Sequence, residues 1–300
     1  MKPAHASPTR RTAPRAPLGV SRAYASVLLC LAAALLVNSI LGPLAFGVVS
    51  YPITETVENQ LIGLELVTVF LVVPWALFAA RAAYRGHPAA PLLGFSPSAY
   101  AVYMFVQYVL GPEYSHYSVT ALAQLGILVL AGGSMMWSWS LARTMPLVSM
   151  RAEQTTRNGL LLLALAAFVL LRYSGVFTGA LRGSELESEF ADERSFFWSI
   201  VLLDLGIVVP CTIAAGLSLM RGSATGHRAL YAAVGWFALV PPSVAAMAAV
   251  MWARNDPHAS ASTVLLLSAA SVAFGAVAWR LFRPLVRAPY GSTIPERNDR

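Results

Sequence analysis

The chain has 300 residues, of which 57% are apolar and only 12% are charged. A soluble domain carries about 25% charged residues, and a charge at the centre of a bilayer costs on the order of 2.5–3.5 kcal/mol. The shortage of charge therefore excludes an ordinary soluble domain and predicts a single all-α, membrane-embedded domain. The net charge of +7 does not indicate nucleic-acid binding, because the basic residues lie between and beside the apolar runs.

Residues 1–21 are rich in proline and arginine and show no apolar period, so we predict a disordered, basic cytosolic tail. The apolar run from about residue 24 to 49 is too long for a signal peptide and lacks a clear cleavage site, which indicates a transmembrane helix. We therefore place the transmembrane domain at residues 22–283 and a polar cytosolic tail at 284–300.

Seven further apolar runs predict a polytopic transmembrane bundle of about eight helices. Each run approaches the roughly 20 residues that cross a bilayer, and only helices satisfy the backbone there. Tyrosines and Gln107 interrupt the third helix, so a seven-helix chain is the alternative. The seven runs are 61–83, 100–110 with its flanks, 119–141, 159–178, 196–220, 229–252 and 263–282.

The distribution of charge predicts the orientation. With the N-terminus inside, 17 of the 21 lysines and arginines fall on the cytosolic side, so both termini should be cytosolic. Arginine outnumbers lysine 20 to 1, which indicates a GC-rich genome and a bacterial plasma (inner) membrane. Most acidic residues fall on the outer side, where they either form a vestibule attractive to cations or are solvated loop charges.

Two segments share a pattern. Glu65 precedes Val72-Val73-Pro74 and then Arg85-Gly86, while Asp204 precedes Val208-Val209-Pro210 and then Arg221-Gly222. A parallel 4+4 helix duplication would produce this spacing. The distance from acid to proline differs, however, at nine residues and six, and short matches in apolar helices also arise by accident.

Three charges lie within the predicted spans: Glu65, Asp204 and Arg172. Each should lie roughly 5–10 Å below the outer end of its helix. If they meet, an arginine between two carboxylates leaves one net negative charge, which suits a cation or a proton. The alternative is a structural ion pair between Arg172 and one acid, with the other acid reaching the interface.

Prolines and a polar stripe are the other candidate features. Pro74, Pro210 and the pair Pro241-Pro242 should break their helices, either to line a binding site or as ordinary kinks. The third helix presents Tyr100, Tyr103 and Gln107 at i, i+3 and i+7. This stripe either lines an aqueous path or forms hydrogen bonds with neighbouring helices.

Signatures of catalysis and of metal binding are absent from the sequence. It contains no HExxH, GxSxG or P-loop motif, and its five histidines lie in predicted tails or loops. We therefore expect no cofactor and no metal site, and a membrane enzyme ranks third, after the two hypotheses of function given below. Cys30 and Cys211 fall within predicted spans, which argues against a disulfide.

The segment LLGFSPSAYAVYMFVQYVLGPEY (Leu92–Tyr114), together with LLDLGIVVP (Leu202–Pro210), resembles a group of uncharacterised multi-pass prokaryotic membrane proteins. The resemblance implies a shared helix bundle. It implies no activity and no site residues.

Two hypotheses of function follow from these features. In the first, the protein moves or senses a small solute, cation or proton through an outward-facing cavity between the second, third, sixth and seventh helices. In the second, it is a non-transporting scaffold or assembly subunit in which that space is packed. Its partners would be the bilayer and, in the first case, a small solute or cation, with no nucleic acid; the oligomeric state stays open.

Overall fold

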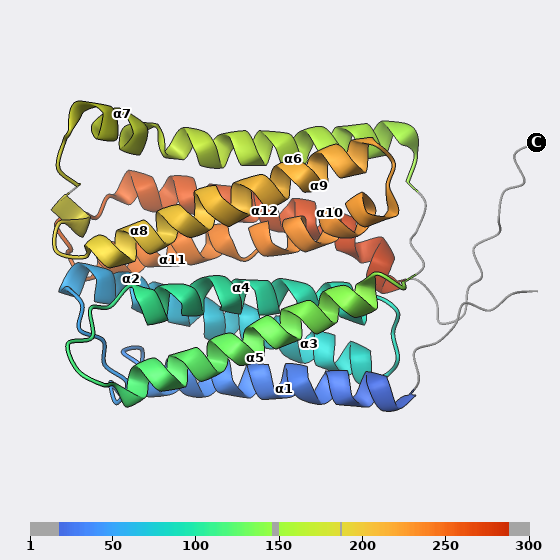
Figure 1. Cartoon of the computed structure of the whole chain (residues 1–300), viewed down its shortest axis with the longest axis horizontal. Coiled ribbons are helices and arrows are strands. Elements are labelled where there is room, and N and C mark those ends of the chain that lie inside the picture. The colour runs from blue at the N-terminus through green and yellow to red at the C-terminus, as the bar shows by residue number, and fades with distance from the viewer. Residues whose placement is uncertain (1–17, 146–149, 187, 288–300) are drawn as a thin grey trace, which may run out of the picture.

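The computed structural model describes residues 18–145, 150–186 and 188–287, and in these ranges every regular element is a helix. Figure 1 shows long helices running side by side in two layers. Residues 18–21 and 284–287 belong to the first and last helices. The rest of both predicted tails lies outside the described residues.

The first layer contains four rods, drawn in blue to green in Figure 1. One of them is continuous but is divided into three elements by a five-residue π-helix, η1. The elements of this layer are α1 (Leu18–Leu41), α2 (Glu55–Val67), η1 (Thr68–Val72), α3 (Val73–Tyr84), α4 (Ala90–Leu110) and α5 (Val119–Ala142).

The second layer, drawn in yellow-green to red, repeats this arrangement. A second π-helix, η3, divides its second rod, and a break at Ala238 and Leu239 divides its third. The elements are α6 (Ala152–Arg172), α7 (Ser174–Arg182), the short 3-10 helix η2 (Ser188–Phe190), α8 (Arg194–Leu203), η3 (Asp204–Val208), α9 (Val209–Met220), α10 (Ala224–Phe237), α11 (Val240–Ala253) and α12 (Ala261–Arg287).

Seven helices of the described chain are long and apolar enough to cross a membrane. The eighth rod, α4, has 21 residues, or about 31 Å at 1.5 Å per residue, but it is less apolar than the others. Its polar side chains face protein, since 13 of its 21 residues are buried. The prediction of an all-α transmembrane bundle of about eight helices is confirmed.

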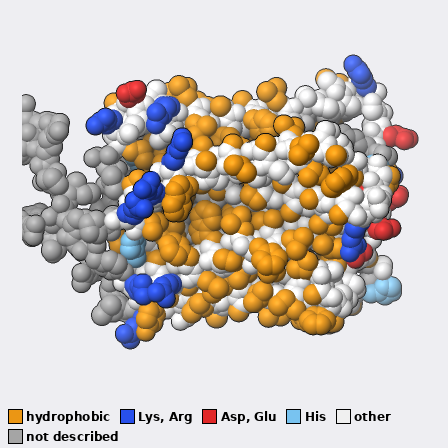
Figure 2. Space-filling model, turned by 180° about the vertical axis from the view of Figure 1, so that it is seen from behind, with side chains coloured by type: hydrophobic (Ala, Val, Ile, Leu, Met, Phe, Trp, Pro, Cys, Tyr) orange, Lys and Arg blue, Asp and Glu red, His pale blue; other side chains and the backbone are white. Residues whose placement is uncertain are grey.

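The ends of the bundle carry opposite charge. In Figure 2 most of the arginine side chains gather at one end of the bundle, and most of the acidic side chains gather at the other end. The two ends are separated by a broad hydrophobic band. The first and last described helices, α1 and α12, reach the basic end (Figure 1), which is the end that we expect to be cytosolic.

Each π-helix is explained by the proline that follows it. A proline inside a helix removes one N–H and clashes with the carbonyl four residues earlier. A π-turn relieves this clash by widening the helix. In η1 the N–H of Val73, next to Pro74, bonds to the Thr68 carbonyl five residues back, and Val209 bonds to Asp204 in the same way.

The two copies of the sequence pattern adopt the same local structure. In both, the π-helix is followed by a 12-residue α-helix with proline in its first turn. Both helices then end at arginine and at a glycine with positive φ, +66° at Gly86 and +70° at Gly222. This match aligns Asp204 with Thr68, and not with Glu65. A duplication of the whole four-helix unit stays a prediction.

The two layers approach closely where α2 crosses α11, at a glycine. A β-carbon added to Gly63 would lie 2.4 Å from the backbone nitrogen of Met247. Small residues at such crossings let helices approach closely, which is how membrane helices gain packing energy. Gly63 therefore sets the spacing between the two halves.

We expect Gly63→Ala to destabilise the protein by about 1–3 kcal/mol, because backbone must move to admit the methyl group. Gly132→Ala is the matched control, since no atom lies within 4 Å of the position of its β-carbon. Unfolding in mixed micelles measures both variants. Equal stability of the two would contradict the close α2–α11 contact.

Candidate functional site

The three charges predicted within the spans fall into two separate clusters. Arg172 and Asp204 form an ion pair, with the Nη2 and Oδ2 atoms 3.7 Å apart. Glu65 instead receives a hydrogen bond from the backbone N–H of Leu44. Both acids lie ten residues from the start of their helices, about 15 Å, which is deeper than the sequence suggested because α2 and α8 begin earlier than predicted.

Asp204 lies at the start of η3 and is fully supplied with partners. Its Oδ1 accepts a hydrogen bond from the Tyr103 hydroxyl at 2.8 Å, and its Oδ2 accepts one from Tyr173 at 2.6 Å. The side chain of Asp204 is 6% exposed, whereas that of Arg172 is 50% exposed. The pair therefore lies at the edge of the bundle, with its acid inside and its base at the surface.

The predicted stripe on α4 reaches both layers. Tyr103 binds Asp204 of η3, whereas Tyr100 bonds to Ser243 of α11 at 2.8 Å. Because the Ser243 hydroxyl donates to the Leu239 carbonyl, it accepts from Tyr100. Tyr100 also interacts with the side chain of Thr68 in η1.

Gln107 does not extend this connection, because its side-chain amide donates to the Tyr103 carbonyl of its own helix. The ring of Tyr103 packs against Trp236 with centroids 5.3 Å apart. These contacts join the second, third, sixth and seventh spans, between which an outward-facing cavity was predicted.

Glu65 has the opposite surroundings. Only 1% of its surface is exposed, and its Oε2 accepts from Leu44 at 3.1 Å while no hydrogen-bond donor reaches its Oε1. A β-carbon on Gly42 would lie 2.6 Å from this Oε1 and 3.0 Å from the Asn38 carbonyl oxygen. The absence of a side chain at Gly42 thus allows the carboxylate to lie against the last turn of α1.

A network of polar side chains extends from this position. The Gln124 amide of α5 donates to Asn38 Oδ1 at 2.8 Å and to the Tyr51 hydroxyl at 2.9 Å. The rings of Tyr51 and Tyr108 lie 5.4 Å apart, and both residues are within electrostatic range of Glu65. We call Glu65, Asn38, Tyr51, Tyr108 and Gln124 the Glu65 cluster.

Three polar atoms in and beside the Glu65 cluster have no hydrogen-bond partner within the described chain. Gln124 Oε1 and Ser39 Oγ, like Glu65 Oε1, are buried without a hydrogen-bond partner. The C-terminal end of α1 adds partial negative charge, and its last turn has no basic residue to offset it. Among the described residues no cation forms a salt bridge with Glu65. An ionised Glu65 here would be an uncompensated buried charge, which is strongly unfavourable.

A cavity of about 280 Å³ lies in the loop between α1 and α2, next to Tyr51 of this cluster. Tyr51 lines the cavity and also accepts the hydrogen bond from Gln124, so it separates the cavity from the buried network. Glu58 and the backbone of the loop supply further polar lining. The residues that line this cavity belong to the first layer alone, and the cavity lies at the end of the bundle that we expect to be the outer one.

Several acidic residues at this end form hydrogen bonds between the two layers. Asp256 accepts from the Asn59 amide at 3.0 Å, and Arg254 donates to the same amide's oxygen at 3.1 Å. Glu193 accepts from the Thr54 N–H, and Glu189 accepts from Gln60. These bonds hold the start of α2 against the loops of the second layer, so these particular acids are not free loop charges.

The pKa of the Asp256 carboxyl reflects these contacts. Burial alone would raise the pKa, but hydrogen bonds from the His258 N–H and from Asn59 outweigh it and hold the pKa below the usual value. Asp256 therefore stabilises the folded protein at neutral pH.

The described residues contain neither a disulfide nor a cluster of metal ligands. Cys30 and Cys211 are free thiols on exposed surface. Within the described ranges no group of three or more histidine, cysteine, aspartate or glutamate side chains is arranged to hold a metal ion.

The sequence identified both acids and two partners of Asp204, Tyr103 and Arg172, but it did not identify Tyr173 or the surroundings of Glu65. Asn38 and Gln124 are polar residues in apolar runs, and Tyr173 follows Arg172 directly, so each had a recognisable signal. The contact of the Leu44 N–H with Glu65 had none, because it depends on how the loop after α1 folds back into the bundle.

Comparison of the chain with protein-family models, curated proteins and solved structures returns no match. Sequence and structure thus define the class, a multi-pass integral membrane protein, and its function must be argued from the two acidic clusters.

We expect Tyr173→Phe to destabilise the protein by about 1.5–3 kcal/mol, because it removes a hydrogen bond to the carboxylate of Asp204. Tyr231→Phe, in a ring that packs on Phe282, is the control and should change stability by less than about 1 kcal/mol. Unfolding in mixed micelles gives both values. A loss as small as the control's would show that Asp204 does not depend on Tyr173.

Asp256→Ala should lower the melting temperature at neutral pH, and the difference from wild type should disappear in acid. The folded-state pKa lies below the unfolded value of about 3.9. The stabilisation is therefore present above that value and is lost as the pH falls through the folded-state pKa. Thermal melting at a series of pH values tests this, with the exposed Asp192→Ala as the control. A difference that persists undiminished in acid would contradict it.

Proposed function

We propose that this protein is a cation- or proton-linked transporter or sensor of a bacterial plasma membrane, and that it binds its ion at Glu65 from the outer side. One observation carries the proposal: the buried Glu65 carboxylate has an orphan oxygen and no salt bridge within the described chain, and Tyr51 of its cluster lines a cavity at the end of the bundle that we expect to face outward. Intramembrane carboxylates are costly to keep, which makes them functional candidates.

The chemistry of the cluster suits two ligands. A proton on Glu65 would neutralise the carboxylate. A hard cation such as Na⁺ prefers oxygen ligands, and Glu65 Oε1 and the Asn38 carbonyl lie close together. The C-terminal end of α1 favours either ligand, because half-helix carboxyl ends and exposed carbonyls hold Na⁺ or H⁺ in membrane transporters.

The π-helices η1 and η3 offer a route by which a bound ion would change the packing of the helices. Glu65 lies three residues before η1, where the backbone already departs from α-helical geometry. Tyr100 links η1 to α11, and Tyr103 links α4 to η3. Neutralising Glu65 would therefore be felt by both π-helices through α4.

The scaffold hypothesis also has an observation in its favour. The hydrogen bond of Tyr103 with Asp204 joins the two layers, as do the hydrogen bonds of Asn59 and Thr54. A bundle fixed in this way suits a protein that presents a constant surface to a partner. In that case Glu65 would be permanently neutral and would bind no cation.

The decisive variant is Glu65→Gln, which mimics the protonated carboxyl. Wild-type protein in liposomes should show a proton or Na⁺ flux, read by an internal pH dye or by radioactive Na⁺, and raising Na⁺ or lowering pH should raise its melting temperature in detergent. We expect Glu65→Gln to abolish the flux and the Na⁺-dependent stabilisation while the protein stays folded. Glu55→Gln, on the exposed first turn of the same helix, should retain both.

Flux and stabilisation that survive in Glu65→Gln would exclude Glu65 as the ion site. Wild-type protein that responds to neither Na⁺ nor pH would favour the scaffold. Gly42→Ala provides an independent check, because the added methyl group would displace the carboxylate without changing its charge.

A further inference from the structure

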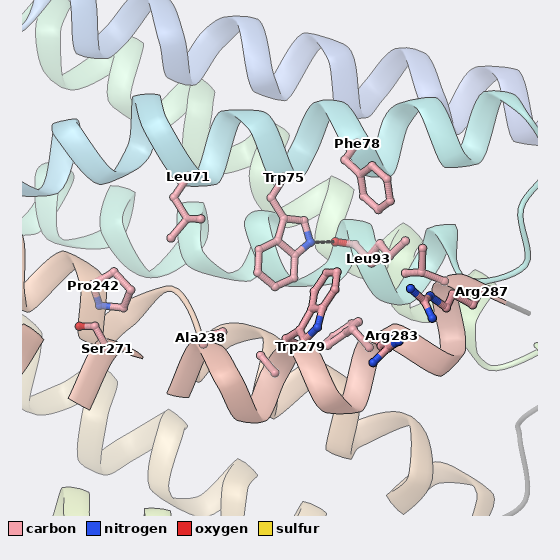
Figure 3. A pocket seen from close by; sticks show the side chains of 14 residues that line it. Leu71, Trp75, Phe78, Leu93, Ala238, Pro242, Ser271, Trp279, Arg283 and Arg287 are labelled. Atoms are coloured by element: carbon pink, nitrogen blue, oxygen red, sulfur yellow. Dashed lines mark hydrogen bonds between the residues drawn. The ribbon is translucent and has the colours of Figure 1, made fainter. Parts of the chain in front are cut away.

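A lateral groove lies between α3 of the first layer and α12 of the second, and it is lined by none of the residues of the two acidic clusters. It encloses about 410 Å³, within the 300–1,000 Å³ typical of ligand sites. Figure 3 shows Trp75 and Phe78 on one wall and Trp279 on the other. Phe78 and Trp279 are 46% and 65% exposed, so the groove opens sideways to the hydrocarbon and not to water.

The wall of the groove is apolar because its polar groups are paired with each other. Pro97 has no N–H to give to the carbonyl of Leu93, four residues earlier on α4. The indole N–H of Trp75 bonds to that carbonyl at 2.9 Å, the dashed line in Figure 3. One hydrogen bond thus satisfies both the orphan carbonyl and the indole. What remains exposed in the groove is suited to an alkyl chain.

The groove is basic at one end only. Arg283 and Arg287, on the last turns of α12, line it near the end of the bundle where arginines gather (Figures 2 and 3). Both side chains are exposed, and neither forms a salt bridge within the described chain. Each guanidinium group presents a planar fork of N–H donors, which matches the oxygens of a phosphate.

The length of the groove matches one leaflet of a bilayer. Along α12 its lining runs from Ser271 to Arg287, 16 residues or about 24 Å. Half of the hydrocarbon thickness is about 15 Å, and the headgroup region extends beyond it. A lipid with its phosphate at the arginines would have its acyl chain in the apolar part of the groove.

We propose that this groove is a binding site for an anionic phospholipid of the inner leaflet, with the phosphate held by Arg283 and Arg287 and one acyl chain lying between α3 and α12. Charge complementarity selects this occupant. Basic pockets between helices on the cytoplasmic side bind anionic headgroups, whereas a second copy of this chain would bring further basic residues to an end that is already basic.

The test measures lipid retained on purified protein by native mass spectrometry after reconstitution in nanodiscs of equal phosphatidylglycerol and phosphatidylcholine. We expect phosphatidylglycerol to be retained at least fivefold over phosphatidylcholine. Replacing both arginines, Arg283→Gln with Arg287→Gln, should remove this preference. Arg280→Gln, an exposed arginine of α12 outside the groove, should keep it.

A second variant tests the apolar part. Gly275 lines the groove and has open space where its β-carbon would lie, so Gly275→Phe should fill the groove and reduce retention of both lipids. Gly132→Phe, at another open helix surface, is its control. Both variants should keep the wild-type melting temperature in the presence of zwitterionic detergent.

Equal retention of the two lipids by wild type would overturn the proposal, as would retention that neither groove variant changes. Dissociation of a dimer in the groove variants, with no loss of lipid, would overturn it in favour of a second copy. These outcomes do not depend on Glu65, because the groove shares no residue with the Glu65 cluster.

Discussion

Everything in this bundle follows from one constraint: inside a bilayer, a polar group has only the protein for a partner. Each helix-breaking proline shows a different solution. At Pro74 and Pro210 the backbone widens into a π-turn, and at Pro241 the helix ends and begins again. At Pro97 the helix continues, and a tryptophan from another helix takes the place of the missing N–H. The polar stripe of α4 obeys the same rule, since its tyrosines contact serine, threonine and aspartate side chains of the neighbouring helices.

Against this background the two buried acids differ in kind. Asp204 has a donor on each oxygen and an arginine beside it, an arrangement that holds three helices in register. Glu65 has one backbone donor, an orphan oxygen and the negative end of a helix nearby. A buried carboxylate is energetically costly at both positions, but only Glu65 has an unpaired oxygen that a bound ion would contact. The number of hydrogen-bond donors on the carboxylate oxygens, and not burial alone, therefore separates a structural acid from a candidate site.

The sequence predicts the fold well and the site only in part. Charge content, run length and the distribution of arginine lead to an eight-rod bundle, because the bilayer imposes those features on any chain. Helix starts are less certain, since polar first turns such as that of α2 look like loop, and the two acids consequently lie deeper than predicted. The sequence also selects Glu65 and Asp204 correctly as buried charges, but the Arg172 side chain is half exposed, and the three charges fall into two clusters. Close contacts, such as that of Gly63 of α2 with Met247 of α11, decide which helices meet. The periodicity of side chains within one helix carries no information about such contacts.

The π-helices have a consequence for the position of Glu65. A π-turn holds one more residue than an α-turn, so η1 stores a register shift of one residue within a continuous rod. If η1 relaxed to α-helix while α3 stayed anchored by Trp75, α2 would rotate about its axis by roughly 100° and advance by about 1.5 Å. Glu65 would leave the end of α1 and turn toward a different neighbour. The extra residue of η1 is thus a stored shift of the helix by one residue. The π-helix η3 holds the same extra residue at the corresponding place in the other half.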